Sequence, residues 1–562
     1  MERLQTGAVS ESVGKKFLTH PNPQMRRNNY VNLNGQWQFT LQENGDLPEV
    51  YDQTIQVPFC PECQLSGLEI QVLPGMYLFY RRMLDIPEIS GRVLLHVGAA
   101  DQIAEIYVNQ FLCGGHIGGY NSFTVDITDA LKTGENELVI RVLDDLRQTT
   151  LPYGKQTLNR GGMWYTPVSG IWQTVWLEYV PAHYIRDLTI ETDLRSAKIT
   201  VEPALSGKVY CQDTAYDLVD GVAVVTPEEA QLWSPENPYL YEFIVETEED
   251  RVESYFALRQ LSVEQVGEYP RLCLNGKPVF FHGLLDQGYW PDGLYTPPSN
   301  AHFADDILRM KRLGFNTLRN HIKVEPETFY CLCDLYGMFV FQDMVNNGDY
   351  SFLRDTVMPT FGIQKRNDRR LHKDQKTREA FLDGMRQTVQ QLKNHPSIVY
   401  WTIFNEGWGQ FCYQDAYEQL KKLDSSRFVG STSGWFKGAD SDVQSHHLYY
   451  TWVTKWEHLK SKDKPLVLTE FGGYSCPVPE HIFNPDKVYG YRLCKDTYSL
   501  QLDIEALYNQ RIIPLKDKGL CAAIYTQVSD VEDEINGLLT YDRKVCKVET
   551  KIMQKIAEKL KI

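Results

Sequence analysis

The chain has 562 residues, enough for several domains, and it is rich in aromatic residues, with 11 Trp, 33 Tyr and 24 Phe. Its formal net charge of −16 argues against nucleic acid or an anionic membrane as the main partner. No apolar segment approaches the roughly 20 residues that a membrane helix needs.

The N-terminal residues and the cysteines indicate the compartment. Residues 1–20 lack the apolar stretch of a signal peptide, and the 12 cysteines show no framework spacing, so we expect a cytoplasmic protein with free thiols. Cys60 and Cys63 have CxxC spacing, but no second pair lies near to complete a zinc site. The surrounding residues predict strand and turn rather than the helix of a redox motif, so a functional role for this pair is disfavoured.

The first part of the chain is β-rich. Short apolar runs at 92–99, 104–109 and 136–143 are separated by turn residues, which predicts a β-sandwich over residues 1–181. The same pattern continues in "YIRDLTIET", "AKITVEP" and "LYEFIVETEE". We therefore predict a second, smaller sandwich of immunoglobulin-like size over residues 182–263.

From residue 264 onward, strand patterns alternate with helical patterns. Apolar residues recur at helical spacing over 375–394, and helical stretches also follow "PVFFHGL" and "NTLRNH". Eight alternations of this kind predict a (β/α)8 TIM barrel over residues 264–562. The candidate strands are "PVFFHGL", "NTLRNH", "FVFQDM", "SIVYWTIFNE", "FVGSTSG", "DVQSHHLYY", "PLVLTEFGG" and "CAAIYTQ".

Two glutamates stand at the ends of barrel strands, where TIM barrels carry their catalytic residues. Glu406 closes the fourth candidate strand and Glu470 closes the seventh, and these strands can face each other across the barrel mouth. A carboxylate pair of this kind performs glycoside hydrolysis, in which one group protonates the leaving oxygen and the other attacks the sugar or activates water. Either glutamate alone is more simply explained by a structural ion pair, but together they favour catalysis.

Longer motifs extend this argument to a family. "HPNPQMRRNNYVNLNGQWQF" (20–39), "NRGGMWYTPVSGIWQTVWLE" (159–178), "LNGKPVFFHGL" (274–284) and "MKRLGFNTLRNH" (310–321), together with Asn405-Glu406 and "TEFGG", resemble glycoside hydrolase family 2. This family contains β-galactosidases, β-glucuronidases and β-mannosidases, and the chain resembles a short form without extra C-terminal domains. The resemblance implies an N-terminal jelly-roll sugar-binding domain, an immunoglobulin-like sandwich and a catalytic TIM barrel.

The resemblance also implies a retaining mechanism, with Glu406 as general acid/base and Glu470 as nucleophile. Arg319 matches the family's arginine and would help to keep Glu470 ionised, and Asn405 matches the asparagine that binds the sugar 2-hydroxyl. Tyr449 is a candidate hydrogen-bond donor to the nucleophile, with a rim aromatic as the alternative. Further candidates for substrate contact are Asp286, Gln287, Tyr289, Trp290, His321, Trp408, Trp435 and Tyr525.

Departures from the family pattern bear on metal and substrate. Gly162 stands where large β-galactosidases carry an acidic metal ligand, so we predict no essential metal and no cofactor. The segment 525–544 lacks the Asn-x-Lys motif of β-glucuronidases and carries an acidic run that would repel a uronate. A neutral sugar, with galactose first, is therefore expected.

Several alternatives stay open from the sequence. Arabinosidase, mannosidase and glucosidase activities compete with β-galactosidase, and a glucuronidase is disfavoured. A non-catalytic carbohydrate-binding protein would have lost a catalytic glutamate, whereas this chain keeps both. The expected partner is an oligosaccharide or glycoside, and a homo-oligomer remains open because sandwich domains of this family often pack across subunit interfaces.

Overall fold

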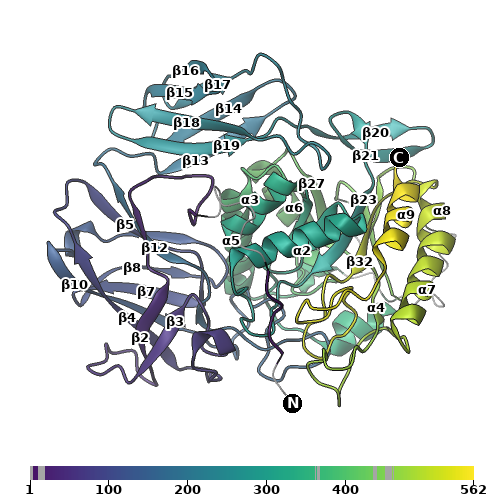
Figure 1. The fold of residues 1–562 in the computed structure, drawn as a ribbon, viewed down its shortest axis with the longest axis horizontal. Helices are drawn as coiled ribbons and strands as arrows, with labels where there is room; N and C mark the ends of the chain where they lie inside the picture. The colour runs from purple at the N-terminus through teal and green to yellow at the C-terminus, as the bar shows by residue number, and fades with distance from the viewer. Residues whose placement is uncertain are drawn as a thin grey trace.

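A computed structural model describes residues 4–9, 19–360, 363, 367–434, 440–449, 459 and 461–562. Two β-sandwiches lie beside a barrel surrounded by helices (Figure 1). The expected fold class, multidomain β and α/β, is confirmed. No helix in these ranges is long and apolar enough to cross a membrane.

The first sandwich packs a four-stranded sheet against a six-stranded sheet. The four-stranded sheet has the order β1 (Tyr30–Asn32), β12 (Val175–Val180), β5 (Arg92–Val97) and β9 (Phe123–Asp126). The six-stranded sheet has the order β3 (Gln53–Val57), β2 (Gly35–Gln42), β4 (Tyr77–Ile86), β10 (Gly134–Leu143), β7 (Ile103–Val108) and β8 (Phe111–Ile117). A short pair, β6 (Ala100–Asp101) and β11 (Gly170–Ile171), lies beside them. Buried residues of both sheets, including Trp37, Leu95 and Ile140, form one core.

The second sandwich has its own hydrophobic core, which includes Leu188, Val209 and Phe243. One sheet contains β13 (Asp187–Thr192), β14 (Ala197–Glu202) and β17 (Val222–Val225). The other contains β16 (Thr214–Leu218), β15 (Gly207–Cys211), β18 (Tyr241–Thr247) and β19 (Arg251–Phe256). Inward residues alternate with outward ones along β14 and β18, as expected for a sheet with one solvated face.

Eight parallel strands form the barrel. Their order is β27 (Phe428–Ser433), β26 (Ile398–Asn405), β25 (Phe339–Asp343), β24 (Thr317–Asn320), β23 (Phe281–Asp286), β32 (Leu520–Thr526), β29 (Leu466–Gly472) and β28 (Gln444–Leu448). Each of the eight strand candidates in the sequence corresponds to one of them. Short sheets flank the barrel, formed by β20 (Leu261–Val266), β21 (Tyr269–Leu274) and β22 (Lys277–Pro278), and by β30 (Tyr474–Ser475) and β31 (Arg492–Leu493).

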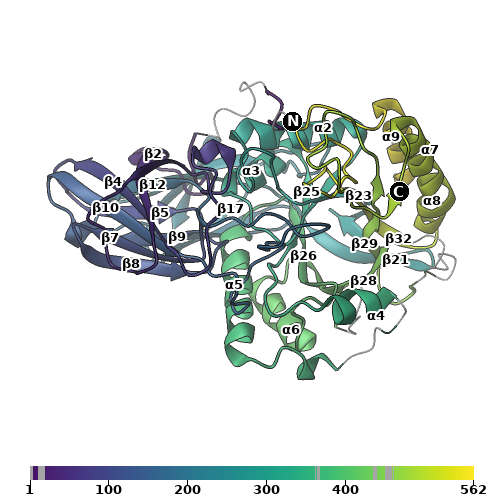
Figure 2. The same cartoon turned by 90° about the horizontal axis from the view of Figure 1, so that it is seen from below.

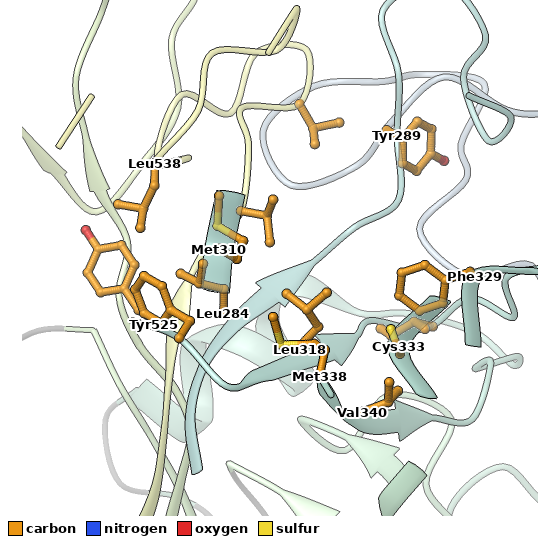
Figure 3. Packing of buried hydrophobic residues seen from close by; sticks show 14 of the residues in the cluster. Leu284, Tyr289, Met310, Leu318, Phe329, Cys333, Met338, Val340, Tyr525 and Leu538 are labelled. Carbon is orange, nitrogen blue, oxygen red and sulfur yellow. The ribbon is translucent and has the colours of Figure 1, made fainter. Parts of the chain in front are cut away.

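Helices cover the outside of the barrel, and their apolar faces pack on its strands. Figure 3 shows this layer, in which Leu284, Leu318 and Val340 of the strands lie near Met310 and Phe329 of the helices. The described helices are α2 (Asn300–Leu313), α3 (Glu327–Tyr336), α4 (Met358–Thr360), α5 (Gln375–Leu392), α6 (Tyr413–Leu423), α7 (Thr497–Leu507), α8 (Ile513–Lys516) and α9 (Thr550–Leu560).

One loop of the first sandwich is bound to the barrel. This 144–169 loop joins β10 to β11, and the sandwich that carries it lies against one side of the barrel in Figure 2. Backbone hydrogen bonds run from Tyr153 N to Asn346 O (3.1 Å) and from Gly348 N to Thr149 O (2.7 Å). Because Asn346 and Gly348 follow strand β25, the loop is held at the carboxyl ends of the barrel strands.

Cys60 and Cys63 are free thiols, each at most 3% exposed. Burial raises the pKa of the Cys60 thiol well above its usual range, and a nearby Cys63 and Glu62 add to this effect. Among the residues described, neither belongs to a group of side chains that could hold a metal ion. A thiol that keeps its proton is a weak nucleophile and ligand, which supports a structural role.

Candidate active site

Glu406 and Glu470 meet at the carboxyl end of the barrel. Strand β26 ends at Asn405, directly before Glu406, and Glu470 lies near the end of β29. The two side chains are buried, and one oxygen of each lies within 4.8 Å of the other and of a ring nitrogen of His447. A separation of this size is close to the about 5–5.5 Å between the carboxyl groups of retaining glycosidases.

The chain turns sharply at Glu406, and the glycines that follow make this turn possible. Glu406 has a φ of +52°, a left-handed conformation that is costly for a residue with a side chain and that is often found at functional sites. Its N–H donates to Ser433 O at 3.0 Å. At Gly409, which has a φ of +65°, a Cβ would lie 2.3 Å from Asn347 O. The chain can therefore turn sharply after the strand and leave the carboxylate in the barrel mouth.

Glu470 is surrounded by hydrogen-bond donors. Arg319 Nη1 donates to Oε1 at 2.9 Å, and the Tyr449 hydroxyl donates to Oε2. Burial raises the pKa of Glu470, and the neighbouring charges of His447 and Arg319 act in the opposite direction. Burial and the Glu470 charge also raise the pKa of Tyr449 well above its usual range, so the phenol keeps the proton that it donates.

Arg319 connects the nucleophile candidate to the rest of the site. Its guanidinium is fully buried, and it donates to Asp343 Oδ1 (3.0 Å) and Asn405 Oδ1 (2.9 Å). The oxygen of Asn405 is therefore occupied, and no described residue accepts from its Nδ2. Asn405 lines the pocket described below, so this amide group has donors available for a sugar hydroxyl.

His447 is a site residue that the sequence reasoning did not identify. Its Nδ1 lies 2.8 Å from Glu406 Oε1 and 3.3 Å from Glu470 Oε2, and its Nε2 lies 2.8 Å from Ser433 Oγ. It precedes Tyr449 by two positions, and residues two apart in a strand point to the same face. That spacing in "HHLYY" was the signal that could have revealed it.

The carboxylates open into a small pocket of about 280 Å³, including its solvent-open mouth. Larger hollows, of about 1230, 1270 and 2340 Å³, lie elsewhere on the described part of the molecule, and none of them contains the carboxylate pair. The lining residues of the small pocket are Lys155, Met163, Leu285, Gln287, His321, Asn405, Glu406, Trp408, Tyr449, Glu470, Tyr491, Thr526 and Glu534.

The structure brings Gln287, His321 and Trp408 to the pocket wall. His321 Nδ1 lies 2.8 Å from Asp343 Oδ2, and burial together with the charge of Lys155 lowers the pKa of His321 to about 3. Its ring is therefore neutral at neutral pH. Trp408 stacks on Trp164 of the 144–169 loop, with ring centroids 5.3 Å apart.

Four other candidates do not line this pocket. Asp286 accepts from Gly288 N at 3.0 Å. Trp290 is 2% exposed and packs under the guanidinium of Arg543, which lies 4.0 Å from its ring centroid. Tyr289 is buried, and Tyr525 packs edge-on against Phe471 of β29. Trp435 lies outside the described residues.

The cluster of Glu406, His447 and Glu470 has the composition of a metal site. However, Arg319 and Tyr449 already bind Glu470, and an arginine this close repels a cation. Overnight incubation with EDTA is therefore expected to leave kcat unchanged in an assay with a nitrophenyl glycoside. A large loss of activity that magnesium restores would contradict this prediction, with zinc and calcium additions as controls.

Comparisons with known proteins agree with this architecture. The family description "Glycosyl hydrolases family 2, TIM barrel domain" matches residues 268–562, and "Glycosyl hydrolases family 2" matches residues 183–259. The chain belongs to glycoside hydrolase family 2. The family that the sequence motifs indicated is confirmed.

Individual family 2 proteins resemble the chain at low identity. A β-galactosidase of Lactococcus lactis subsp. lactis is 27% identical over 480 residues, which is 77% of this chain and 44% of that protein. The chain thus spans about half the length of such relatives. A β-glucuronidase of an uncultured Clostridium sp. has a TM-score of 0.74 at 19% identity and covers 96% of this chain and 99% of its own. A β-galacturonidase of Eisenbergiella tayi has a TM-score of 0.70 at 20% identity, with 95% and 97% covered.

Proposed function

We propose that the chain is a retaining exo-β-glycosidase that removes a terminal, non-reducing, neutral β-linked sugar, with galactose as the first candidate. The observation that carries this proposal is the Glu406–Glu470 pair in a small pocket at the carboxyl end of the barrel. A small pocket, rather than a long open groove, favours the end of a sugar chain over its interior. The curated β-galactosidase relatives add support for the sugar.

The reaction follows from the geometry in two steps. Glu470 attacks the anomeric carbon and forms a glycosyl ester, while Glu406 gives its proton to the departing glycosidic oxygen. Glu406 then takes a proton from water, whose oxygen attacks the same carbon and releases Glu470. Arg319 and Tyr449 stabilise the charged form of Glu470, and Asn405 Nδ2 would hold a sugar hydroxyl.

Glu534 supports a neutral sugar. It lines the pocket, and its carboxylate accepts from Asn536 Nδ2 at 2.9 Å and from the Tyr165 hydroxyl. Neither partner carries a positive charge, so a uronate beside Glu534 would meet repulsion. Elsewhere in the acidic run, Asp530 is neutralised by Lys547 at 2.7 Å.

A uronidase is the second candidate, and one observation favours it. Lys155 supplies a positive charge to the pocket wall, and no carboxylate of the described residues pairs with it. The names of the solved family 2 structures, a β-glucuronidase and a β-galacturonidase, point in the same direction, although their low identity limits the likeness to the fold. We rank this candidate second because the carboxylates of Glu470 and Glu534 both line the pocket and would repel a uronate.

A panel of nitrophenyl β-glycosides separates these candidates. We expect the galactoside to have the highest kcat/KM and the glucuronide and galacturonide to be hydrolysed far more slowly. Proton NMR of the first-formed sugar should show the β-anomer, as retention requires. If a uronide is the best substrate, the second candidate is favoured. If no glycoside is hydrolysed, the proposal that the chain is a glycosidase is refuted. A cytoplasmic location and the assembly of several copies stay predictions.

A further inference from the structure

Lys155 is a buried cation in the wall of the active-site pocket. It belongs to the 144–169 loop of the first sandwich and is 7% exposed. Its Nζ lies 5.5 Å from the ring centroid of Tyr165 and 5.8 Å from that of Trp408. Within the described ranges, Nζ has no carboxylate partner and no hydrogen-bond acceptor. The reaction as derived above does not use this residue.

The backbone on both sides of Lys155 is held firmly. Gly154 N donates to Asn346 O of the barrel at 3.4 Å. The side chain of Gln156 donates to Asp101 Oδ2 at 2.7 Å and accepts from Val168 N at 2.6 Å. Because both neighbours are anchored, the loop directs the Lys155 side chain to the pocket wall.

An ammonium group in this position needs acceptors. It carries three N–H donors and accepts nothing, and two aromatic faces compensate for only part of its lost hydration. Because Lys155 lines the pocket and its Nζ has no acceptor among the described residues, a ligand that enters the pocket and offers acceptors would be bound favourably. Sugar hydroxyl oxygens are such acceptors. The carboxylates of Glu470 and Glu534, which line the same pocket, favour a neutral group over a further anion.

We infer that Lys155 is a specificity-determining residue, which binds a hydroxyl group of the terminal sugar from the side of the first sandwich. This inference rests on the proposed function, because it concerns the same pocket. It assigns part of the sugar recognition to a segment outside the barrel. A substrate that lacks this hydroxyl should therefore be hydrolysed equally well with and without the Lys155 ammonium group.

The test compares K155M, which keeps the length and loses the charge, with K155R, which keeps N–H donors. K208M is the matched control, because Lys208 is half-exposed and pairs with Asp217 in the second sandwich. The substrates are the best nitrophenyl glycoside of the panel and its monodeoxy analogues, each lacking one ring hydroxyl. Thermal unfolding is measured for every variant, and calorimetry with the free monosaccharide reads binding without turnover.

We expect K155M to lower kcat/KM for the parent glycoside roughly 10- to 150-fold, the range for a lost hydrogen bond to a charged group. K155R should recover part of this loss, and K208M should match the wild type. One monodeoxy analogue should be hydrolysed equally well by K155M and the wild type, which identifies the hydroxyl.

Three results would overturn the inference. They are an unchanged kcat/KM in K155M with only a lower Tm, an equal loss on every deoxy analogue, and a loss confined to uronides. Failure of the proposed function is distinguishable, because the wild type would then hydrolyse a uronide best or hydrolyse no glycoside at all. If no glycoside is hydrolysed, weaker binding of the neutral monosaccharide to K155M would still support the contact, and unchanged binding would refute it.

Discussion

Glu470→Gln is expected to lower kcat by roughly 10⁴- to 10⁶-fold, the range for loss of a group that acts within a catalytic unit. The amide keeps the volume of the carboxylate, and its oxygen can still accept from Arg319, which now binds Glu470 at 2.9 Å. The fold should therefore survive while the attacking charge is lost. Steady-state hydrolysis of the best nitrophenyl glycoside measures the change, with circular dichroism and Tm as checks of folding.

Two further variants sharpen this prediction. Glu268→Gln is the matched control, because Glu268 is largely exposed on the β20–β21 hairpin, and it should keep full activity. Glu470→Ala should regain turnover of an activated glycoside with added azide and give a glycosyl azide of inverted configuration. Turnover near the wild-type rate in Glu470→Gln would remove the nucleophile assignment.

Glu406→Gln should lower kcat/KM most for the substrates whose leaving group most needs a proton. Alkyl glycosides, whose leaving oxygen is strongly basic, should lose several orders of magnitude in kcat/KM, and dinitrophenyl glycosides should lose little in the glycosylation step. The glutamine cannot donate the proton that Glu406 supplies. The basic limb of the pH profile of kcat/KM should flatten as well.

The comparison of leaving groups is the decisive measurement for Glu406. Single-turnover kinetics isolate the glycosylation step from the later attack of water, which also needs Glu406 as base. If Glu406→Gln slows alkyl and dinitrophenyl glycosides equally in this step, Glu406 is not the acid. Its left-handed φ of +52° would then have only a structural meaning.

The barrel could be predicted from the sequence because its strands are buried on both faces and therefore have nearly continuous apolar runs. Strand β26 is the clearest case, with every residue from Ile398 to Asn405 buried. The carboxylates could be found because they directly follow such runs. The boundaries at 181 and 263 stay predictions.

The rest of the site could not be predicted, because it depends on which distant segments touch. Lys155 reaches the pocket through a loop of another sandwich, and no periodicity of the sequence encodes that contact. Trp290 illustrates the opposite case, because its place directly after a strand suggested contact with the substrate. In the structure the guanidinium of Arg543 covers its ring instead. His447 was missed but could have been predicted, because it lies two residues before Tyr449 and strand alternation places both on one face.

The 144–169 loop also has a consequence for biosynthesis. A ribosome completes Lys155 before any barrel strand, and it reaches Glu534 of the same pocket 379 residues later. At 5–20 residues per second, this interval lasts roughly 20–75 s. During that time the sandwich can fold, but its loop has no barrel to bind. If the proposed hydrolysis needs Lys155 and Glu534 in one pocket, the nascent chain should gain activity only after residue 534 has been translated and the loop has docked on the barrel.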